Sequence, residues 1–232
     1  MDAAALLANI PDVPHLVEAR GMLLSGDGGV IWTDGASAIL HSPDDLLACV
    51  VGSVPATELA AALSQLPPKT ELVIGEEYVP NAGVPGWTGQ IAIVHVEPEH
   101  LAVSSAPGCE VRVLGIGEPL DLSLVPLDLR RELEDAFTFS PLAVTSVNGR
   151  PVAFCYAGWV TETLWDMSID TLESWRNRGY ARAAAAALLS AMRSRGKRAV
   201  WAALSSNEPS LRLAARLGFS PVSRVWVLTR RV

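Results

Sequence analysis

The chain has 232 residues, enough for one large domain or two small ones. Half of the residues are hydrophobic, but the apolar runs are short and broken by Gly and Pro, so we expect no membrane span, which needs about 18 apolar residues in a row. The formal net charge of −7 argues against nucleic acid as a partner, because domains that bind phosphate backbones usually carry a strong basic excess.

The N-terminal third of the chain predicts a helix followed by an antiparallel meander. Residues 1–18 have a helical composition, and Pro11 and Pro14 are expected to end the first helix early. Short apolar runs separated by Gly, Asp and Ser then predict strands at 22–24, 29–32, 36–40 and 46–51. The later residues of this part predict a helix at 55–66, with Ser53 as its N-cap and Pro67 after its end. Two strands and an intervening loop are expected beyond it, at 71–75, 91–96 and 80–89.

We place a domain boundary between residues 108 and 109, after the turn sequence Ala-Pro-Gly. Residues 1–108 then form an N-terminal α+β domain in which we find no motif tied to chemistry. Residues 109–232 form a second domain. Its first elements are expected to be a strand at 110–114 and a helix at 126–137.

Two hairpins are predicted next. Asn148-Gly149 lies between apolar runs at 142–147 and 150–157, and Asn-Gly favours a type I′ turn because both of its central residues need positive φ. A second hairpin is expected to turn near Thr161, before a strand at 164–170 with alternating apolar and polar residues.

A basic, Gly-containing turn follows this strand and leads into an Ala-rich helix at 179–195. The first amides of a helix have no intrahelical acceptor, and the helix dipole adds about +0.5 charge there. Gly179 lets a ligand approach the backbone, and Arg176 and Arg178 add positive charge. The turn is therefore a candidate site for phosphate or pyrophosphate, and an ordinary strand-to-helix turn with solvated arginines is the alternative. A strand, a short helix and a last strand are expected after it, at 198–204, 211–217 and 222–232.

Charge is distributed unevenly between the two parts of the chain. Residues 150–232 carry 13 of the 18 Lys and Arg, whereas residues 1–149 carry 20 of the 25 Asp and Glu. Two explanations stay open: complementary halves that pack together, or a basic half that receives an anionic cofactor beside an acidic half that faces a cationic acceptor.

Two motifs in this order resemble the GNAT superfamily of acyl-CoA-dependent N-acyltransferases. The family's phosphate loop, Arg/Gln-x-x-Gly-x-Gly/Ala, is matched by Arg176, Gly179 and Ala181. Its second signature, an Asn that opens a helix ending in Leu-Gly-Phe, is matched by Asn207 and the sequence at 217–219. The resemblance covers roughly residues 110–232. The order of strand, helix, three antiparallel strands, helix, strand, helix and strand also resembles the GNAT core.

The resemblance implies an α/β fold of the α+β type, with a mixed, mostly antiparallel twisted sheet flanked by helices. The meander and helix at 20–66 resemble the second half in outline, as a degenerate GNAT-like duplicate would. The implied cofactor is acetyl-CoA, with its pyrophosphate at the turn and its pantetheine arm along the strand at 169–171. The residues expected to bind coenzyme A are Ile169, Asp170, Thr171, Arg176, Asn177, Arg178, Gly179, Tyr180, Ala181, Arg182, Asn207 and Ser210.

The resemblance also implies a general base on the strand before the phosphate loop. Asp166 is the first candidate, and Glu162 and Asp170 are alternatives; a solvated carboxylate is the competing interpretation of Asp166. Many relatives carry a proton-donating Tyr in the last helix, where this chain has Ala214. Thiolates have a pKa near 8.5 and can depart without strong acid assistance, so this departure from the pattern does not exclude the reaction. Cys155, between two aromatic residues of a strand, is interpreted as core packing rather than as a nucleophile.

We therefore expect an N-acetyltransferase that uses a small-molecule amine, an amino acid or a protein N-terminus as acceptor. A non-catalytic acyl-CoA-binding regulatory module is the alternative. A P-loop or Rossmann domain fits less well, because Gly-Lys-Ser/Thr is absent and the preceding strand belongs to an antiparallel run.

We expect no metal site, because the four His lack ligand spacing. The start of the chain lacks a basic signal-peptide region, and the three Cys are widely spaced, so we expect reduced thiols and a cytoplasmic location. The excess of 16 Arg over 2 Lys suggests a bacterial origin, and a homodimer stays an open alternative.

Overall fold

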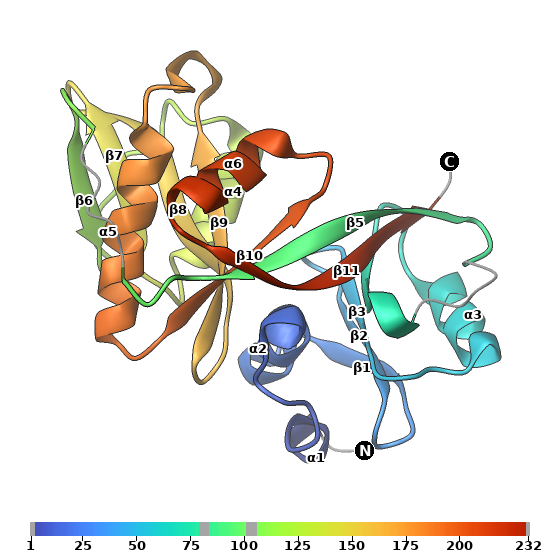
Figure 1. The fold of residues 1–232 in the computed structure, drawn as a ribbon. Helices are drawn as coiled ribbons and strands as arrows, with labels where there is room; N and C mark the ends of the chain where they lie inside the picture. The colour runs from blue at the N-terminus through green and yellow to red at the C-terminus, as the bar shows by residue number, and fades with distance from the viewer. Residues whose placement is uncertain (1–2, 79–83, 101–105, 231–232) are drawn as a thin grey trace. The chain divides into compact units, whose positions relative to one another are not determined.

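The computed structural model describes residues 3–78, 84–100 and 106–230. By their mutual contacts, the residues divide into two units that are interleaved along the chain (Figure 1). The first unit comprises 1–95, 202–211 and 221–232, and the second comprises 96–201 and 212–220. The boundary expected between residues 108 and 109 stays a prediction, because contacts measure packing and not independent folding.

The first unit is built on a mixed sheet. Its strand order is β1-β2-β3-β4-β11-β5, in which β3 and β4 are parallel and the β1–β2, β2–β3 and β4–β11 pairs are antiparallel. The strands are β1 (Gly29–Thr33), β2 (Ala38–Ser42), β3 (Leu47–Val51), β4 (Glu71–Gly75), β5 (Trp87–Val96) and β11 (Ser220–Arg230). The helices are α1 (Ala3–Leu7), α2 (Val17–Ser25) and α3 (Ala56–Gln65), with 3-10 turns η1 (Pro14–Leu16) and η2 (Glu76–Tyr78). Leu59, Ala62 and Leu63 of α3 pack against apolar residues of the sheet.

Three expectations for this unit are wrong. Residues 22–24 belong to α2 and not to a strand, because three apolar residues without alternation continue a helix that starts at Val17. Ser53 does not cap α3, because the helix begins at Ala56 and Pro55 holds the N-cap position without a side-chain hydrogen bond. The loop expected at 80–89 is shorter, because β5 begins at Trp87 and pairs three residues that were assigned to the loop. Residues 80–83 of that loop, and 231–232 of the last strand, lie outside the described residues.

The second unit has the predicted order of elements. The strands are β6 (Glu110–Leu114), β7 (Leu142–Val147), β8 (Arg150–Val160), β9 (Leu164–Thr171) and β10 (Arg198–Leu204), in the sheet order β10-β9-β8-β7-β6. The helices are α4 (Leu127–Ala136), α5 (Tyr180–Ser194) and α6 (Glu208–Arg216), with a 3-10 turn η3 (Glu173–Trp175). Asn148 and Gly149 have φ of 50° and 76°, which confirms the predicted type I′ turn. β6 to β9 are antiparallel, whereas β9 and β10 are parallel.

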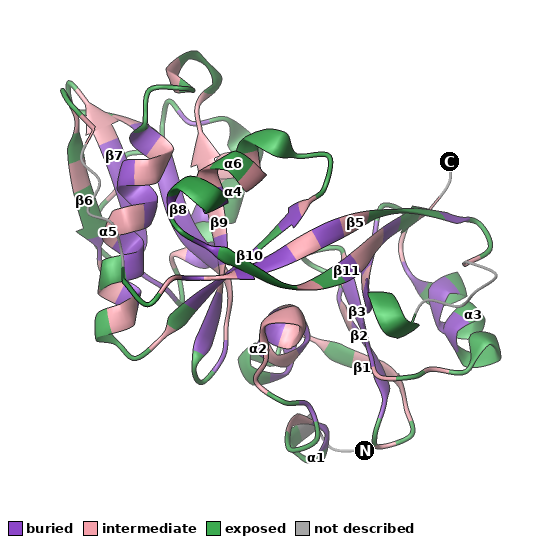
Figure 2. Cartoon of the chain, viewed as in Figure 1, coloured by how far each residue is buried: buried purple, intermediate pink, exposed green. Residues whose placement is uncertain are grey.

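Helices α4 and α5 cover opposite faces of this sheet. Leu133 of α4 packs in one cluster with Phe154 and Tyr156 of β8. On the other face, Thr145 Oγ1 of β7 donates to the carbonyl of Tyr180, the first residue of α5, at 3.1 Å. Figure 2 shows the buried stripe of α5 that faces the sheet. Since side chains alternate along a strand, successive side chains of β8 and β9 point in turn toward the α4 face and the α5 face of the sheet.

Both units contain three antiparallel strands, a helix and then a strand parallel to the third. In the first unit these are β1, β2, β3, α3 and β4, and in the second they are β7, β8, β9, α5 and β10. The outline similarity expected from residues 20–66 is thus present in the topology. That the first unit arose as a degenerate duplicate stays a prediction.

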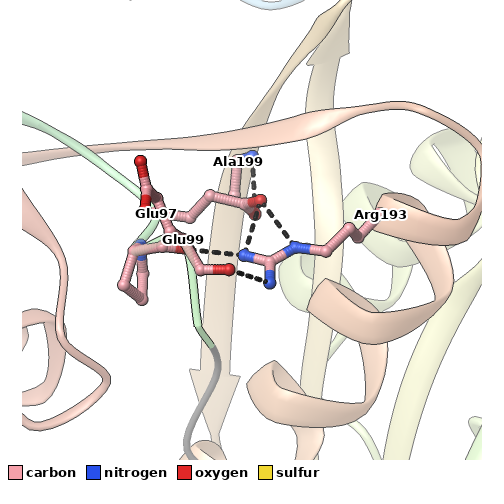
Figure 3. Close-up of polar contacts among 5 residues, drawn as sticks. Glu97, Glu99, Arg193 and Ala199 are labelled. Carbon is pink, nitrogen blue, oxygen red and sulfur yellow. Dashed lines mark hydrogen bonds and ion pairs between the residues drawn. The ribbon is translucent and has the colours of Figure 1, made fainter.

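A buried ion pair ties the C-terminal end of α5 to the segment that follows β5 (Figure 3). The Glu97 side chain is 2% exposed, and its Oε1 accepts from Arg193 Nε and Nη2 at 3.1 and 3.0 Å. Its Oε2 accepts from the Ala199 amide at 2.9 Å, and Arg193 also donates to the carbonyls of Pro98 and Glu99. The buried carboxylate is therefore paired and hydrogen-bonded, as burial of a charge requires.

Arg193→Lys is expected to lower the free energy of unfolding by about 1–2 kcal/mol. The change keeps the charge, but an ammonium group cannot reproduce the planar fork that holds Glu97 and two carbonyls. Urea unfolding measures the difference, with Arg195→Lys, an exposed position two residues away, as the matched control. Equal unfolding midpoints for the two variants would contradict the stabilising role of the pair.

Candidate functional site

The predicted phosphate turn connects β9 to α5 through η3. Gly179 is the N-cap of α5, with φ of 84°, and Asn177 also has a positive φ of 62°. Among the described residues, a Cβ on Gly179 would meet only Ala106 Cβ, at 3.8 Å, which leaves room there for a ligand to approach the backbone. The two positive-φ residues, Asn177 and Gly179, thus form the turn through which the chain passes from the end of β9 into α5.

The start of α5 presents unsatisfied donors. Within the described residues, no acceptor is assigned to the amides of Tyr180, Ala181 or Arg182, and the first bond of the helix runs from Ala183 N to Gly179 O. Arg182 Nε is buried and also has no partner there. An anion at this helix end would satisfy these groups and be favoured by the helix dipole.

Three arginines lie along this turn without acidic partners. In the part of the chain that the structure describes, no ion pair joins Arg176, Arg178 or Arg182 to a carboxylate. Arg176 Nε donates to the Thr171 carbonyl at 3.2 Å, which keeps this side chain near the end of β9. The turn therefore concentrates positive charge that the protein itself leaves uncompensated.

The Tyr180 side chain does not join this open surface. It is 8% exposed and packs with Val152, Ala153 and the partly buried Trp175. Of the coenzyme-binding residues expected from sequence, Tyr180 can therefore contribute only its amide.

β9 and β10 separate next to the residues expected to bind the pantetheine arm. They are paired only from Leu164–Arg198 to Asp166–Val200, although β9 continues to Thr171. In the described residues, the rest of β9 is thus paired on its β8 side alone. Ile169, Asp170 and Thr171 lie in this stretch, where the free edge can offer backbone donors and acceptors.

Asp166 lies at the last paired position, on the face of the sheet that α4 covers. Opposite it, β8 has a bulge, because Ala157 pairs with Met167 and Val160 with Trp165, which leaves Gly158 and Trp159 facing one residue. A Cβ on Gly158 would lie 2.9 Å from Asp166 Oδ2, so only Gly leaves room for the carboxylate. Burial raises the Asp166 pKa to about 6, although the Met167 amide lowers it in part.

Tyr156 links the same face of the sheet to α4. Its hydroxyl lies 2.7 Å from Glu132 Oε1 of α4 and 2.8 Å from Asp170 Oδ2 of β9. Burial and these two carboxylates raise the Tyr156 pKa, so the phenol keeps its proton and acts as a hydrogen-bond donor. The side chain of Asp170 is therefore engaged, while its backbone stays on the free edge of β9.

The remaining predicted site residues lie elsewhere. Glu162 is exposed in the turn between β8 and β9, about 13 Å along the strand from Asp166 by strand rise. Asn207 and Ser210 cluster with the first unit. Asn207 Oδ1 accepts from Ser210 N at 3.3 Å, which confirms its role as the cap of α6; its contact with the pantetheine arm stays a prediction.

Ala214 and Cys155 are core residues. Ala214, in the position of the family's Tyr, is 0% exposed in the middle of α6. Cys155 is also 0% exposed, and burial raises the pKa of its thiol, which agrees with packing rather than nucleophilic attack.

Ala214→Tyr is expected to destabilise the protein by about 1–3 kcal/mol, because the added ring must displace a packed core. The idea that a phenol could be added here to serve the thiolate is therefore disfavoured. Thermal unfolding measures the change, with Ala215→Tyr on the exposed face of α6 as control. An unchanged midpoint with a gain in turnover would show that this position does have room for a proton donor.

Sequence reasoning missed Gly158, Tyr156 and Glu132. An isolated Gly within a strand pattern is a signal for a bulge or a close approach, and Gly158 could have been found by it. The pairing of Tyr156 with Glu132 has no local signal, because it joins residues 24 positions apart.

Comparison with known proteins finds one matching family model. Residues 143–226 match the family model described as GNAT acetyltransferase. Over these residues the chain is similar to GNAT acetyltransferases. The matched segment contains β8, β9, the phosphate turn and α5, so the arginines, the open helix end and Asp166 all fall within it. The family transfers acyl groups from acyl-CoA, which agrees with an anion site beside a strand edge. No curated protein matches the chain.

Solved structures support the fold over nearly the whole chain. A GCN5-related N-acetyltransferase from Kribbella flavida has a TM-score of 0.68 at 17% identity, covering 94% of each chain. An acetyltransferase of the GNAT family from Colwellia psychrerythraea has a TM-score of 0.58 at 12% identity, covering 99% of this chain and 94% of its own. A tandem GNAT protein from the clavulanic acid biosynthesis pathway has a TM-score of 0.60 at 12% identity, with the same coverage. The chain thus has a GNAT fold, a mostly antiparallel mixed sheet flanked by helices, as the sequence predicts.

The described residues contain neither a metal-ligand cluster nor a membrane-spanning helix. No group of three or more His, Cys, Asp or Glu is placed to hold a metal ion. Among the helices that the structure describes, none is both long and apolar enough to cross a membrane.

Proposed function

We propose that this protein is an N-acetyltransferase that transfers the acetyl group of acetyl-CoA to a primary amine by direct attack in a ternary complex. The observation that carries the proposal is the position of Asp166, a part-buried carboxylate with a raised pKa, at the point where β9 and β10 separate. The acceptor is a small molecule, an amino acid or a protein N-terminus, and the reaction takes place in the cytoplasm.

The residues of the matched segment fit coenzyme A. The unsatisfied amides at 180–182 and the orphaned Arg182 Nε suit a pyrophosphate, and Arg176 and Arg178 add positive charge that suits an anionic cofactor. The free edge of β9 at 169–171 suits the amides of the pantetheine arm, which would add hydrogen bonds as a strand does. When bound, acetyl-CoA supplies a thioester whose carbonyl carbon accepts the amine.

Asp166 is proposed to remove the proton from the ammonium group of the acceptor. Its pKa of about 6 leaves it ionised at pH 7 and closer to the pKa of an amine than an ordinary Asp, which makes it a better base. Asp170 suits this role less, because Tyr156 engages its carboxylate, and Glu162 is far along the strand. Gly158 acts through Asp166 by leaving space for its carboxylate.

A non-catalytic acyl-CoA-binding module is the second candidate. It is favoured by the burial of Ala214, which leaves no phenol where many relatives have one. A binding module needs the same anion site but no general base. It therefore gives no role to the Asp166 carboxylate, which lies opposite the bulge in β8.

Thiol release and calorimetry distinguish the two candidates. The protein is incubated with acetyl-CoA and a panel of primary amines, free CoA thiol is measured, and the affinity for CoA is measured in parallel. CoA binding with amine-dependent thiol release supports the enzyme. Binding without release for any amine, including peptides with free N-termini, supports the module, and absence of binding contradicts both.

A further inference from the structure

Arg178 has a different orientation from the other two arginines of the turn. Its Cζ lies 5.1 Å from the centroid of the Trp175 ring, within the range of a cation–π contact. Its Nη2 donates to the Ser174 carbonyl at 3.1 Å. Both partners belong to η3, so the guanidinium lies over η3 although its residue is exposed. Two contacts therefore hold an exposed side chain that would otherwise sample many rotamers.

The three arginines divide between three places. Arg176 is bonded to the last residue of β9, and Arg182 belongs to the first turn of α5 with its Nε buried. Arg178 lies over η3, beside the helix end but outside its first turn. In the described residues none of them has an acidic partner, so the protein leaves their positive charge for an anion to compensate.

Coenzyme A carries more phosphate than the helix end can use. The amides at 180–182 and Arg182 suit the pyrophosphate, and the molecule has one further phosphate, on the 3′ position of its ribose. Resting on the proposed function, we propose that Arg178, held in place by Trp175, binds this 3′-phosphate. The protein thereby distinguishes coenzyme A from 3′-dephospho-CoA. Arg suits the role, because its planar fork binds phosphate oxygens in pairs and stacks on an aromatic ring at the same time.

The test is a cycle of two ligands and two proteins, measured by calorimetry at low ionic strength. Wild type is expected to bind CoA about 10-fold more tightly than 3′-dephospho-CoA, the lower end expected for a charge-assisted contact at an exposed position. Arg178→Ala is expected to lose this preference because its affinity for CoA falls, whereas its affinity for 3′-dephospho-CoA stays within about 2-fold of wild type. Higher salt should shrink the wild-type preference.

Two further variants separate positioning from charge. Trp175→Leu keeps Arg178 but removes the ring beneath it, and we expect a partial loss of the preference, with rescue in Trp175→Phe. Arg195→Ala removes an exposed arginine at the other end of α5 and is expected to keep the wild-type ratio.

Four outcomes overturn the assignment. Equal wild-type affinity for the two ligands shows that no 3′-phosphate contact exists, while leaving the proposed function intact. An Arg178→Ala variant that loses both ligands equally moves Arg178 to the pyrophosphate. A drop in the ratio for Arg195→Ala shows that net charge, not position, is responsible. Wild type that binds neither ligand contradicts the proposed function as well.

Discussion

Asp166→Asn is expected to lower kcat/KM for the amine by about 10²–10⁴-fold while leaving the affinity for CoA unchanged, because a general base is lost and the phosphate turn is not touched. The wild-type kcat/KM should rise with pH through about 6, as the carboxyl ionises, and the variant should lack this limb. Steady-state kinetics from pH 5 to 9 measure both effects. Glu162→Gln, an exposed carboxyl in the turn before β9, is the matched control.

The same variant should be more stable than wild type at neutral pH. Burial raises the Asp166 pKa from 3.8 in the unfolded chain to about 6 in the folded protein. The folded state therefore favours the neutral carboxyl, so the free energy of unfolding is highest below pH 3.8 and falls as the pH rises to about 6. Asn carries no charge at either pH, and we expect a gain of the order of 1–3 kcal/mol at pH 7 that shrinks toward pH 4. An unchanged rate with unchanged stability would mean that Asp166 is an ordinary surface carboxylate.

Gly179→Glu is expected to abolish the stabilisation of the protein by CoA. At a CoA concentration of 100 times the Kd, wild type should gain about 2.7 kcal/mol of stability, and the variant should gain none, because a carboxylate would occupy the place of the pyrophosphate. The apo protein should still fold, since among the described residues a Cβ at this position meets only Ala106, at 3.8 Å, and the main cost is the strain of a positive φ. Thermal unfolding with and without CoA measures the effect.

Gly196→Glu provides the control for Gly179→Glu. Gly196 follows the C-terminal end of α5, has φ of 75°, and has nothing within 4 Å of an added Cβ. The Gly196→Glu variant therefore has the same backbone strain and the same added charge as Gly179→Glu, but away from the turn. CoA should stabilise this variant as much as it stabilises wild type. If Gly179→Glu binds CoA as tightly as this control, the pyrophosphate does not lie at the start of α5.

Much of the second unit could be predicted because its chemistry is local. Asn148-Gly149 adopts the positive φ that its composition predicts, and Gly179 caps α5 within one residue of the expected start. Asp166 was the first candidate base because the resemblance implies a base on the strand before the phosphate loop; the structure places it where β9 and β10 separate, and its role as a base stays a prediction.

What could not be predicted depends on contacts between distant segments. The raised Asp166 pKa follows from burial, and its carboxylate lies against Gly158 at a bulge in another strand. The bonds of Tyr156 to Glu132 and Asp170 require the register of β8 and β9 and the docking of α4, which no short pattern encodes. Residues 22–24 were misassigned because a run of three apolar residues fits a helix as well as a strand.

The pairing of β11 with β4 affects the order in which the protein can be made. Val225 to Thr229 pair with Glu71 to Gly75, so an interior strand of the first unit's sheet is synthesised after all the other strands that the structure describes. Until then, a ribosome-bound chain holds β4 with an open edge that is available for pairing with other chains. No single cut in the chain can release either unit whole, and a fragment ending at residue 108 would lack the strand that its sheet needs. β11 therefore completes the pairing of β4, and a truncation that removes residues 220–230 should destabilise the first unit.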